Sequence, residues 1–186
     1  MTDPTSYKAG PWRFVPALAQ AGLFAFFCTY LDPVSGGQIF DYVYPWVPAL
    51  GIEAAFRIDA LSLLFALLIT GIGAICFLYA ASYFEADRRL KRLLTLMSLF
   101  AAAMLGLVLA DDAIMLFVAW EMTTLTSFLL VGFDHQKERA RYSAQQALLI
   151  TGIGGLALMA GLILMGEAAG TYRISQMGDL TNGPMY

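Results

Sequence analysis

The chain has few charged residues. Only 13% of its 186 residues are Asp, Glu, Lys or Arg, whereas 59% are hydrophobic and the mean hydropathy is +0.67. A soluble domain carries about 25% charged residues, because its surface must face water. Most of the surface of this chain is therefore predicted to face lipid or other membrane proteins.

Metal ligands and redox groups are also scarce. The chain has one histidine and two cysteines, and Cys28 and Cys76 each lie within an apolar run. No metal-ligand spacing joins them, so we interpret them as buried thiols and predict no disulfide and no metal site. No phosphate-binding loop, catalytic triad or cofactor motif is present, so no cofactor is expected. The net charge of −3 argues against nucleic acid as a partner, which would need clustered Lys and Arg.

Long hydrophobic runs are what the sequence has instead. A helix needs about 20 apolar residues to cross a hydrocarbon core of about 30 Å, and charged residues mark where each run ends. Such runs must be helical, because lipid offers no partners to backbone polar groups. The predicted spans are residues 14–31, 58–84, 93–110, 113–133 and 143–166. The fold is therefore predicted to be all-α, a polytopic bundle of about five transmembrane helices, of which the first is the weakest because Pro16 and Gln20 interrupt its start.

The distribution of positive charge predicts the orientation of these spans. Nine Lys and Arg lie in three segments, and Arg57 and Arg173 are the two that lie elsewhere. Because Lys and Arg in short loops favour the cytoplasmic side, these segments are predicted to be cytoplasmic and the protein to lie in the cell inner (plasma) membrane. The predicted cytoplasmic segments are residues 1–13, 85–92 and 134–142, and the predicted extracytoplasmic ones are residues 32–57 and 167–186. The first of the extracytoplasmic segments is rich in Pro, Gly and aromatic residues, which predicts an ordered loop with short strands.

Glu121 is the ionisable residue that lies deep within a predicted span. It is the ninth residue of the segment 113–133, and a charge at that depth costs about 3 kcal/mol on insertion scales. Such residues usually face the interior of a bundle and take part in ion or proton pathways. Thr124, one helical turn further, is expected to hydrogen-bond the carboxyl group or a water beside it. The alternative is a structural glutamate that pairs with another helix, across a subunit interface for example.

Weaker polar candidates lie near the ends of the spans. Asp111 and Asp112 join two predicted spans, and they either concentrate cations at the outer mouth of this hairpin or form a solvated turn. Asp59 is explained by the N-cap of a helix. His135, in a charged loop, is either solvated or feeds protons inward. Four glycines of the last span either allow close helix packing or break the helix beside a cavity: Gly152, Gly154, Gly155 and Gly161.

Residues 108–133, with Trp120-Glu121-Met122 near their centre, resemble the central signature of the proton-conducting antiporter family. Residues 144–161 are similar to the helix that follows this signature, and residues 56–62 to an upstream helix. The family includes the large membrane-arm subunits of respiratory complex I and the A and D subunits of Mrp-type cation/proton antiporters. The run after Glu121 is similar to that of the A-type Mrp subunits.

The resemblance implies a role for Glu121 and a set of partners. In the family this glutamate is the essential intramembrane acid, so the resemblance implies exchange of protons for Na⁺ or K⁺ within a complex of other membrane subunits. Family members have many more helices and a partner lysine on a later helix, whereas no lysine lies within a predicted span here, so we expect a fragment. The alternatives are a proton-translocating membrane-arm subunit of a complex I-like NADH:quinone oxidoreductase or membrane-bound hydrogenase, and a non-transporting scaffold. The protein is expected to be a transporter subunit rather than an enzyme.

Overall fold

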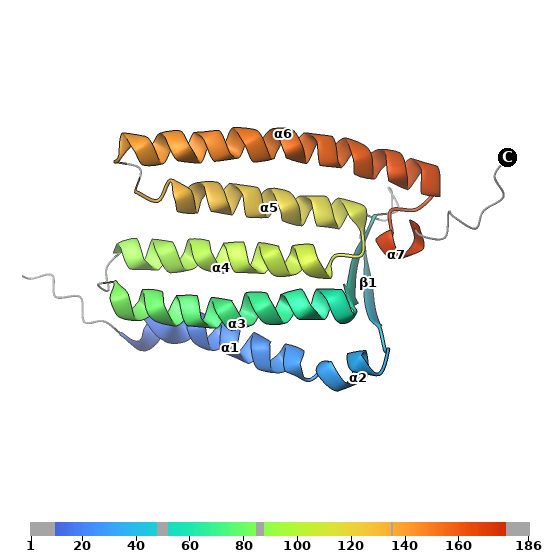
Figure 1. Ribbon diagram of the computed structural model, residues 1–186, viewed down its shortest axis with the longest axis horizontal. Coiled ribbons are helices and arrows are strands. Elements are labelled where there is room, and N and C mark those ends of the chain that lie inside the picture. Colours follow the sequence, from blue (N-terminus) through green and yellow to red (C-terminus); the bar gives the residue numbers. More distant parts are fainter. Residues whose placement is uncertain (1–9, 48–51, 85–87, 135, 178–186) are drawn as a thin grey trace, which may run out of the picture.

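The computed structural model describes residues 10–47, 52–84, 88–134 and 136–177. Four long helices lie side by side in one antiparallel layer, and a shorter helix packs against the first of them (Figure 1). The long helices are α3 (Ala60–Tyr83), α4 (Arg88–Leu109), α5 (Ala113–Val131) and α6 (Glu138–Ala169), and the shorter one is α1 (Val15–Cys28). Short elements complete the described fold: η1 (Pro11–Phe14), α2 (Leu31–Ser35), β1 (Phe40–Val47), β2 (Ile52–Ile58) and α7 (Ile174–Met177).

Within the described residues, four helices are long and apolar enough to cross a membrane, namely α3, α4, α5 and α6. This confirms the predicted fold class, a bundle of transmembrane helices. The first predicted span, 14–31, is different. Its helix α1 has 14 residues and ends at Cys28, where the chain turns into α2. A helix of that length spans about 21 Å, which is less than a hydrocarbon core of about 30 Å. A membrane span at residues 14–31 therefore stays a prediction.

Side-chain caps explain where two of the long helices begin. Asp59 accepts a hydrogen bond from the Ser62 amide at 2.9 Å, and the Ser62 hydroxyl accepts one from the Asp59 amide at 2.8 Å. This reciprocal pair starts α3 and confirms the predicted N-cap. Asp112 caps α5 in the same sense, because its carboxylate accepts from the amides of Ile114 and Met115.

The helices α4 and α6 begin before the charged residues that mark the limits of the predicted spans. The spans were predicted to begin at residues 93 and 143, but the helices begin at Arg88 and Glu138. Lipid excludes charge, whereas the helical backbone tolerates Arg, Lys and Glu well, so a helix can run on past the hydrocarbon core. The helix α6 ends at Ala169 and is followed by its C-cap Gly170, whose φ of 67° is the left-handed conformation that favours glycine.

The strands β1 and β2 form an antiparallel hairpin within the predicted extracytoplasmic loop, which agrees with the short strands expected there. Phe40 pairs with Ile58 at its open end, and an irregularity lies between Pro45 and Val47. The hairpin runs across one end of the helix layer, near α7 (Figure 1). There the amide of Asp111 donates to the carbonyl oxygen of Ala55 at 2.8 Å, so β2 is bonded to the α4–α5 connection.

Buried side chains are few, and they concentrate between α1, α3 and α4. Phe77 and Leu90 lie in one apolar cluster there, and Phe27 and Leu63 lie in a second one nearer the hairpin. Large apolar side chains cover the outside of the layer, as expected of a surface that faces lipid or neighbouring proteins. The interpretation of both cysteines as buried thiols is wrong, because Cys76 is exposed on α3 and Cys28 is only partly buried. Each cysteine lies on an apolar helix, and one face of such a helix points away from the bundle.

Candidate functional site

The carboxyl group of Glu121 lies in the interface between α5 and α6. Its Oε1 occupies the space that a Cβ atom at Gly155 would fill, and the indole Nε1 of Trp120 lies beside the same space, 3.7 Å from it. A side chain at position 155 would therefore displace the Glu121 carboxyl group from this place against α6. No hydrogen bond or ion pair to the Glu121 carboxylate is found among the described residues, and its side chain is partly buried.

The hydroxyl-rich turn beside Glu121 is satisfied by its own helix. Thr124 was predicted to hydrogen-bond the carboxyl group or a water beside it. Its hydroxyl is buried and donates instead to the carbonyl oxygen of Trp120 at 3.2 Å. Thr123 donates to the same oxygen, and Thr126 to the carbonyl oxygen of Met122. In a helix the carbonyl one turn back lies within reach of every Thr hydroxyl, which explains why this bond forms in place of the predicted one.

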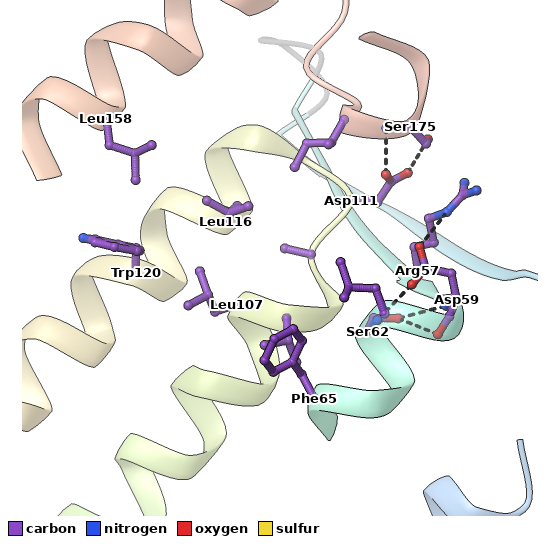
Figure 2. A pocket seen from close by; sticks show the side chains of 14 residues that line it. Arg57, Asp59, Ser62, Phe65, Leu107, Asp111, Leu116, Trp120, Leu158 and Ser175 are labelled. Carbon is purple, nitrogen blue, oxygen red and sulfur yellow. Dashed lines mark hydrogen bonds and ion pairs between the residues drawn. The ribbon is translucent and has the colours of Figure 1, made fainter. Parts of the chain in front are cut away.

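A cavity of about 640 Å³ leads from the hairpin end of the bundle toward Trp120. Its polar side chains gather at the hairpin end, and Trp120 and Leu158 lie at the other end, between α5 and α6 (Figure 2). Leu107, Leu116 and other apolar residues line the stretch between them. The polar residues that line it are Arg57, Asp59, Ser62, Asp111 and Ser175. The cavity therefore connects the charged hairpin end of the bundle with the residue next to Glu121.

Asp111 is buried, and a solvated turn is the wrong interpretation of it. Its side chain is 3% exposed and accepts hydrogen bonds from the amide of Ser175 at 2.9 Å and from the Ser175 hydroxyl at 2.7 Å. The Arg173 guanidinium lies 3.1 Å from the same carboxylate. Segments distant in the sequence fold over this turn, namely β2 and residues 171–177. The predicted spans alone do not indicate that this turn is covered.

Asp112 is buried as well, at 1% exposure. Burial raises the pKa of its carboxyl above the usual value, and the negative charges of Glu53 and Asp111 act in the same direction. The amide hydrogen bonds of the α5 N-cap oppose this shift. The charge of Asp112 is thus used to start α5, so this residue is not a solvated turn either.

The remaining predicted site residue, His135, lies outside the described residues. Glu121, Thr124, Asp111 and Asp112 do not form one cluster, because the first two lie along α5 and the aspartates lie at its start. No group of three or more His, Cys, Asp or Glu side chains that could hold a metal ion occurs in the described part of the chain. Sequence patterns alone missed Gly155 as the partner of Glu121, although its place in a glycine-rich helix was a signal, and they missed Arg173 and Ser175.

Comparison with known proteins gives two family matches. Residues 46–93 match the family described as NADH-ubiquinone oxidoreductase (complex I), chain 5 N-terminus. Residues 110–185 match the family described as NADH:quinone oxidoreductase/Mrp antiporter, transmembrane. Together the two matches cover the end of β1, β2, α3, the start of α4, and α5, α6 and α7.

Relatives extend the match across most of the chain. It is 42% identical over 153 residues, 82% of its length, to the A subunit of a Na⁺/H⁺ antiporter of Alkalihalophilus pseudofirmus. It is 39% identical over 185 residues, 97% of its length, to the A/B subunit of a probable K⁺/H⁺ antiporter of Rhizobium meliloti. The matches cover 19% and 18% of those proteins, so the chain spans about a fifth of the length of these relatives.

Solved structures share the fold. The Mrp complex from Dietzia sp. is similar with a TM-score of 0.78 and 36% identity, over 89% of this chain and 18% of that one. An archaeal membrane-bound sulfane sulfur reductase is similar with a TM-score of 0.72 over 93% of this chain and 26% of that one, and at 18% identity it shows the fold alone. With the two family matches and the relatives, these likenesses confirm the resemblance seen in residues 108–133. The chain belongs to the proton-conducting antiporter family of complex I and Mrp-type membrane subunits, and it is similar to one part of the A-type Mrp subunits.

Proposed function

We propose that this chain is part of a transporter subunit that exchanges protons for Na⁺ or K⁺ within a complex of several membrane subunits, and that Glu121 lies in the proton or cation pathway. The observation that carries the proposal is the carboxyl group of Glu121, held against Gly155 at the α5–α6 interface without a bonding partner among the described residues. Named relatives that are Na⁺/H⁺ and K⁺/H⁺ antiporter subunits support the transported ions.

The arrangement suits reversible proton binding. An uncompensated charge at membrane depth is costly, and a carboxyl group is able to bind and release a proton. A cation or a positively charged group that comes near favours the ionised form, and the proton then leaves. The neighbouring hydroxyls are occupied by backbone carbonyls, which leaves Glu121 as the titratable group of this part of α5. Proton release and cation arrival are coupled in this scheme by a single carboxylate.

The cavity beside Trp120 supplies a route from one side of the membrane. We place its charged end, with Asp59 and Asp111, on the extracytoplasmic side of the plasma membrane, because the basic loops lie at the opposite end of the bundle. Ions or water would enter among these polar side chains and reach the apolar stretch that ends at Trp120. The N-terminus is cytoplasmic in this arrangement.

A second candidate is a proton-translocating membrane-arm subunit of a complex I-like or hydrogenase-linked assembly. The family matched by residues 46–93 is described by complex I, which favours this alternative. The same Glu121 would then move protons without exchanging a cation. Neighbouring genes discriminate the two: small membrane subunits of an Mrp set support the antiporter, and quinone or iron–sulfur subunits support the alternative.

The test is substitution of Glu121 in the assembled complex, with proton exchange measured in everted vesicles at several pH values. Glu121→Gln keeps the shape but cannot titrate, so exchange should be abolished while native gels still show the complex. Glu121→Asp withdraws the carboxyl group by one methylene, and partial exchange with a shifted pH optimum is expected. Glu138→Gln, at an exposed glutamate at the start of α6, is the matched control and should exchange normally.

Gly155→Ala supplies an independent arm of the test. The added methyl group would collide with Glu121 Oε1 and displace the carboxyl group, so exchange should fall while Glu121 itself is intact. Gly154→Ala, one residue earlier, meets nothing within 4 Å and should leave exchange unchanged. Wild-type exchange in an assembled Glu121→Gln complex would make this glutamate structural and leave the scaffold interpretation standing.

A further inference from the structure

The indole N–H of Trp120 is a buried hydrogen-bond donor. Its Nε1 is enclosed by atoms of this chain, and no hydrogen-bond partner for it is found among the described residues. Buried N–H groups are almost always paired, because an unpaired one loses its bond to water and gains nothing in return. An acceptor for this N–H is therefore expected close by. A group from elsewhere in a larger assembly would have to displace the enclosing atoms to reach it.

The carboxyl group of Glu121 is an acceptor within reach. Glu121 Oε1 and Trp120 Nε1 both lie within 4 Å of one point, the position that a Cβ atom at Gly155 would take. Side chains of neighbouring helix residues usually diverge, and these two converge where Gly155 leaves room for both. The indole ring lies between α5 and α6, with its nitrogen turned away from the hairpin end of the cavity (Figure 2). Rotation about the side-chain bonds of Glu121 can therefore bring its carboxylate to hydrogen-bond distance of the indole.

The hydroxyl groups near Glu121 donate to other acceptors. Thr123 and Thr124 each donate to a backbone carbonyl oxygen of α5. Thr151, one turn before Gly155, donates to a backbone carbonyl oxygen of α6. At this level of the α5–α6 interface, the indole N–H is therefore the side-chain donor that the described residues leave for the carboxylate.

We propose that Trp120 is the positioning residue of Glu121, and that its indole N–H donates to the ionised carboxylate when that group leaves its place against Gly155. A hydrogen bond to a charged acceptor is shorter and stronger than a neutral one. The carboxyl group then has two places, one against Gly155 and one at the indole, where the cavity ends. The proposal rests on the proposed function, because the place of the carboxylate matters to transport only if Glu121 carries the proton or binds the cation.

The experiment removes the N–H and keeps the ring, in the membrane complex that contains this chain. Trp120→benzothienylalanine, introduced by suppression of a stop codon, has sulfur in place of the indole N–H and nearly the same shape. Exchange in everted vesicles should fall about tenfold, the order expected for one hydrogen bond to a charged group. Trp120→Phe, which also loses ring volume, should lower exchange at least as much. Trp46→benzothienylalanine, at an exposed tryptophan of β1, is the matched control and should exchange like wild type.

Infrared spectroscopy separates positioning from packing. The carboxylate bands of Glu121 are identified in pH-difference spectra of the complex by their absence from Glu121→Gln. The frequency of a carboxylate stretch depends on the hydrogen bonds that the oxygens accept. These bands should therefore shift in Trp120→benzothienylalanine and stay in place in the Trp46 control, whereas a tryptophan that only packs would leave them unchanged.

Two results would overturn the proposal. Wild-type exchange by Trp120→benzothienylalanine would show that the ring only packs. Reduced exchange with unshifted Glu121 bands would mean that the N–H serves another group. Failure of the proposed function looks different: Glu121→Gln would then exchange normally, and bands that still shift in the Trp120 variant would show that the hydrogen bond exists without a role in transport.

Discussion

The two ends of the helix layer carry opposite charge and use it in different ways. At the hairpin end Asp111 and Asp112 are almost fully buried. The Asp111 carboxylate bonds Ser175, far along the sequence, and the Asp112 carboxylate starts α5. At the opposite end Arg89 and Lys137 are exposed at 69% and 75% and share the carboxylate of Asp134. Buried charge therefore holds distant segments together at the first end, whereas the ion pairs at the second end are exposed to screening by solvent and salt.

Labelling tests which end faces the outside, and its expected effect is all or none. A cysteine placed at Ser35, exposed before the hairpin, should react with an impermeant thiol reagent added to intact cells. A cysteine at Gln136, exposed in the basic loop, should react only after the cells are opened. Cys76, which is exposed on α3, must first be replaced by serine. The reverse pattern would invert the membrane orientation and contradict the charge rule for this chain.

Removal of Asp111 should have the largest effect on stability. Asp111→Ala leaves Arg173 without its ion pair and the Ser175 amide and hydroxyl without their acceptor, so unfolding should become easier by about 3 kcal/mol. Thermal unfolding in detergent measures this change. The exposed pair at the same end is the control: Asp41→Ala loses a contact with Arg57 at 3.5 Å and should change stability by less than about 1 kcal/mol. Equal effects of the two substitutions would contradict the importance of burial.

Substitution of Asp112 separates the cap from the charge. Asp112→Ala should cost about 1 kcal/mol, because the α5 amides lose their acceptor, whereas Asp112→Asn keeps an acceptor and should cost little. Burial raises the pKa of the folded carboxyl, so the folded state binds its proton more tightly than the unfolded chain does. The stability of wild type relative to Asp112→Asn should therefore decline as pH rises from about 4 through the raised pKa. A relative stability that rises over this interval would contradict burial as the dominant cause.

The smallest effect is expected at Asp134. A hydrogen bond from Lys137 holds the pKa of this carboxyl below its usual value, and the positive charge of Arg89 adds to the shift. The stabilisation by these ion pairs is therefore present above the pKa of the unfolded chain. It is lost as pH falls through the lower pKa of the folded state, and solvent and salt screen it. The melting temperature of Asp134→Asn should lie within a few degrees of wild type and the difference should vanish in high salt. A large, salt-independent loss would show that this end is as tightly built as the other.

Local patterns predicted the helices well and the contacts between them poorly. The spans that became α3 and α5, the Asp59 cap and the short α4–α5 connection follow from apolar run length and from side chains within three positions. The burial of Asp111 depends on Ser175, 64 positions away, and the fit of Glu121 depends on Gly155. No local periodicity encodes such pairs. The Thr124 prediction failed for the opposite reason, since a nearer acceptor existed on its own helix.

The bond between β2 and the α4–α5 connection has a mechanical consequence. The amide of Asp111 is fastened to Ala55, and the amide of Ala113 donates to the carbonyl oxygen of Tyr172, so backbone straps hold the start of α5 from two sides. Any tilt of α5 against its neighbours must therefore rotate about this end, which the backbone hydrogen bonds hold in place. Displacement then grows with distance along the rod: small at Asp112, larger at Glu121, largest at Val131. The hairpin therefore fixes the point about which α5 can tilt.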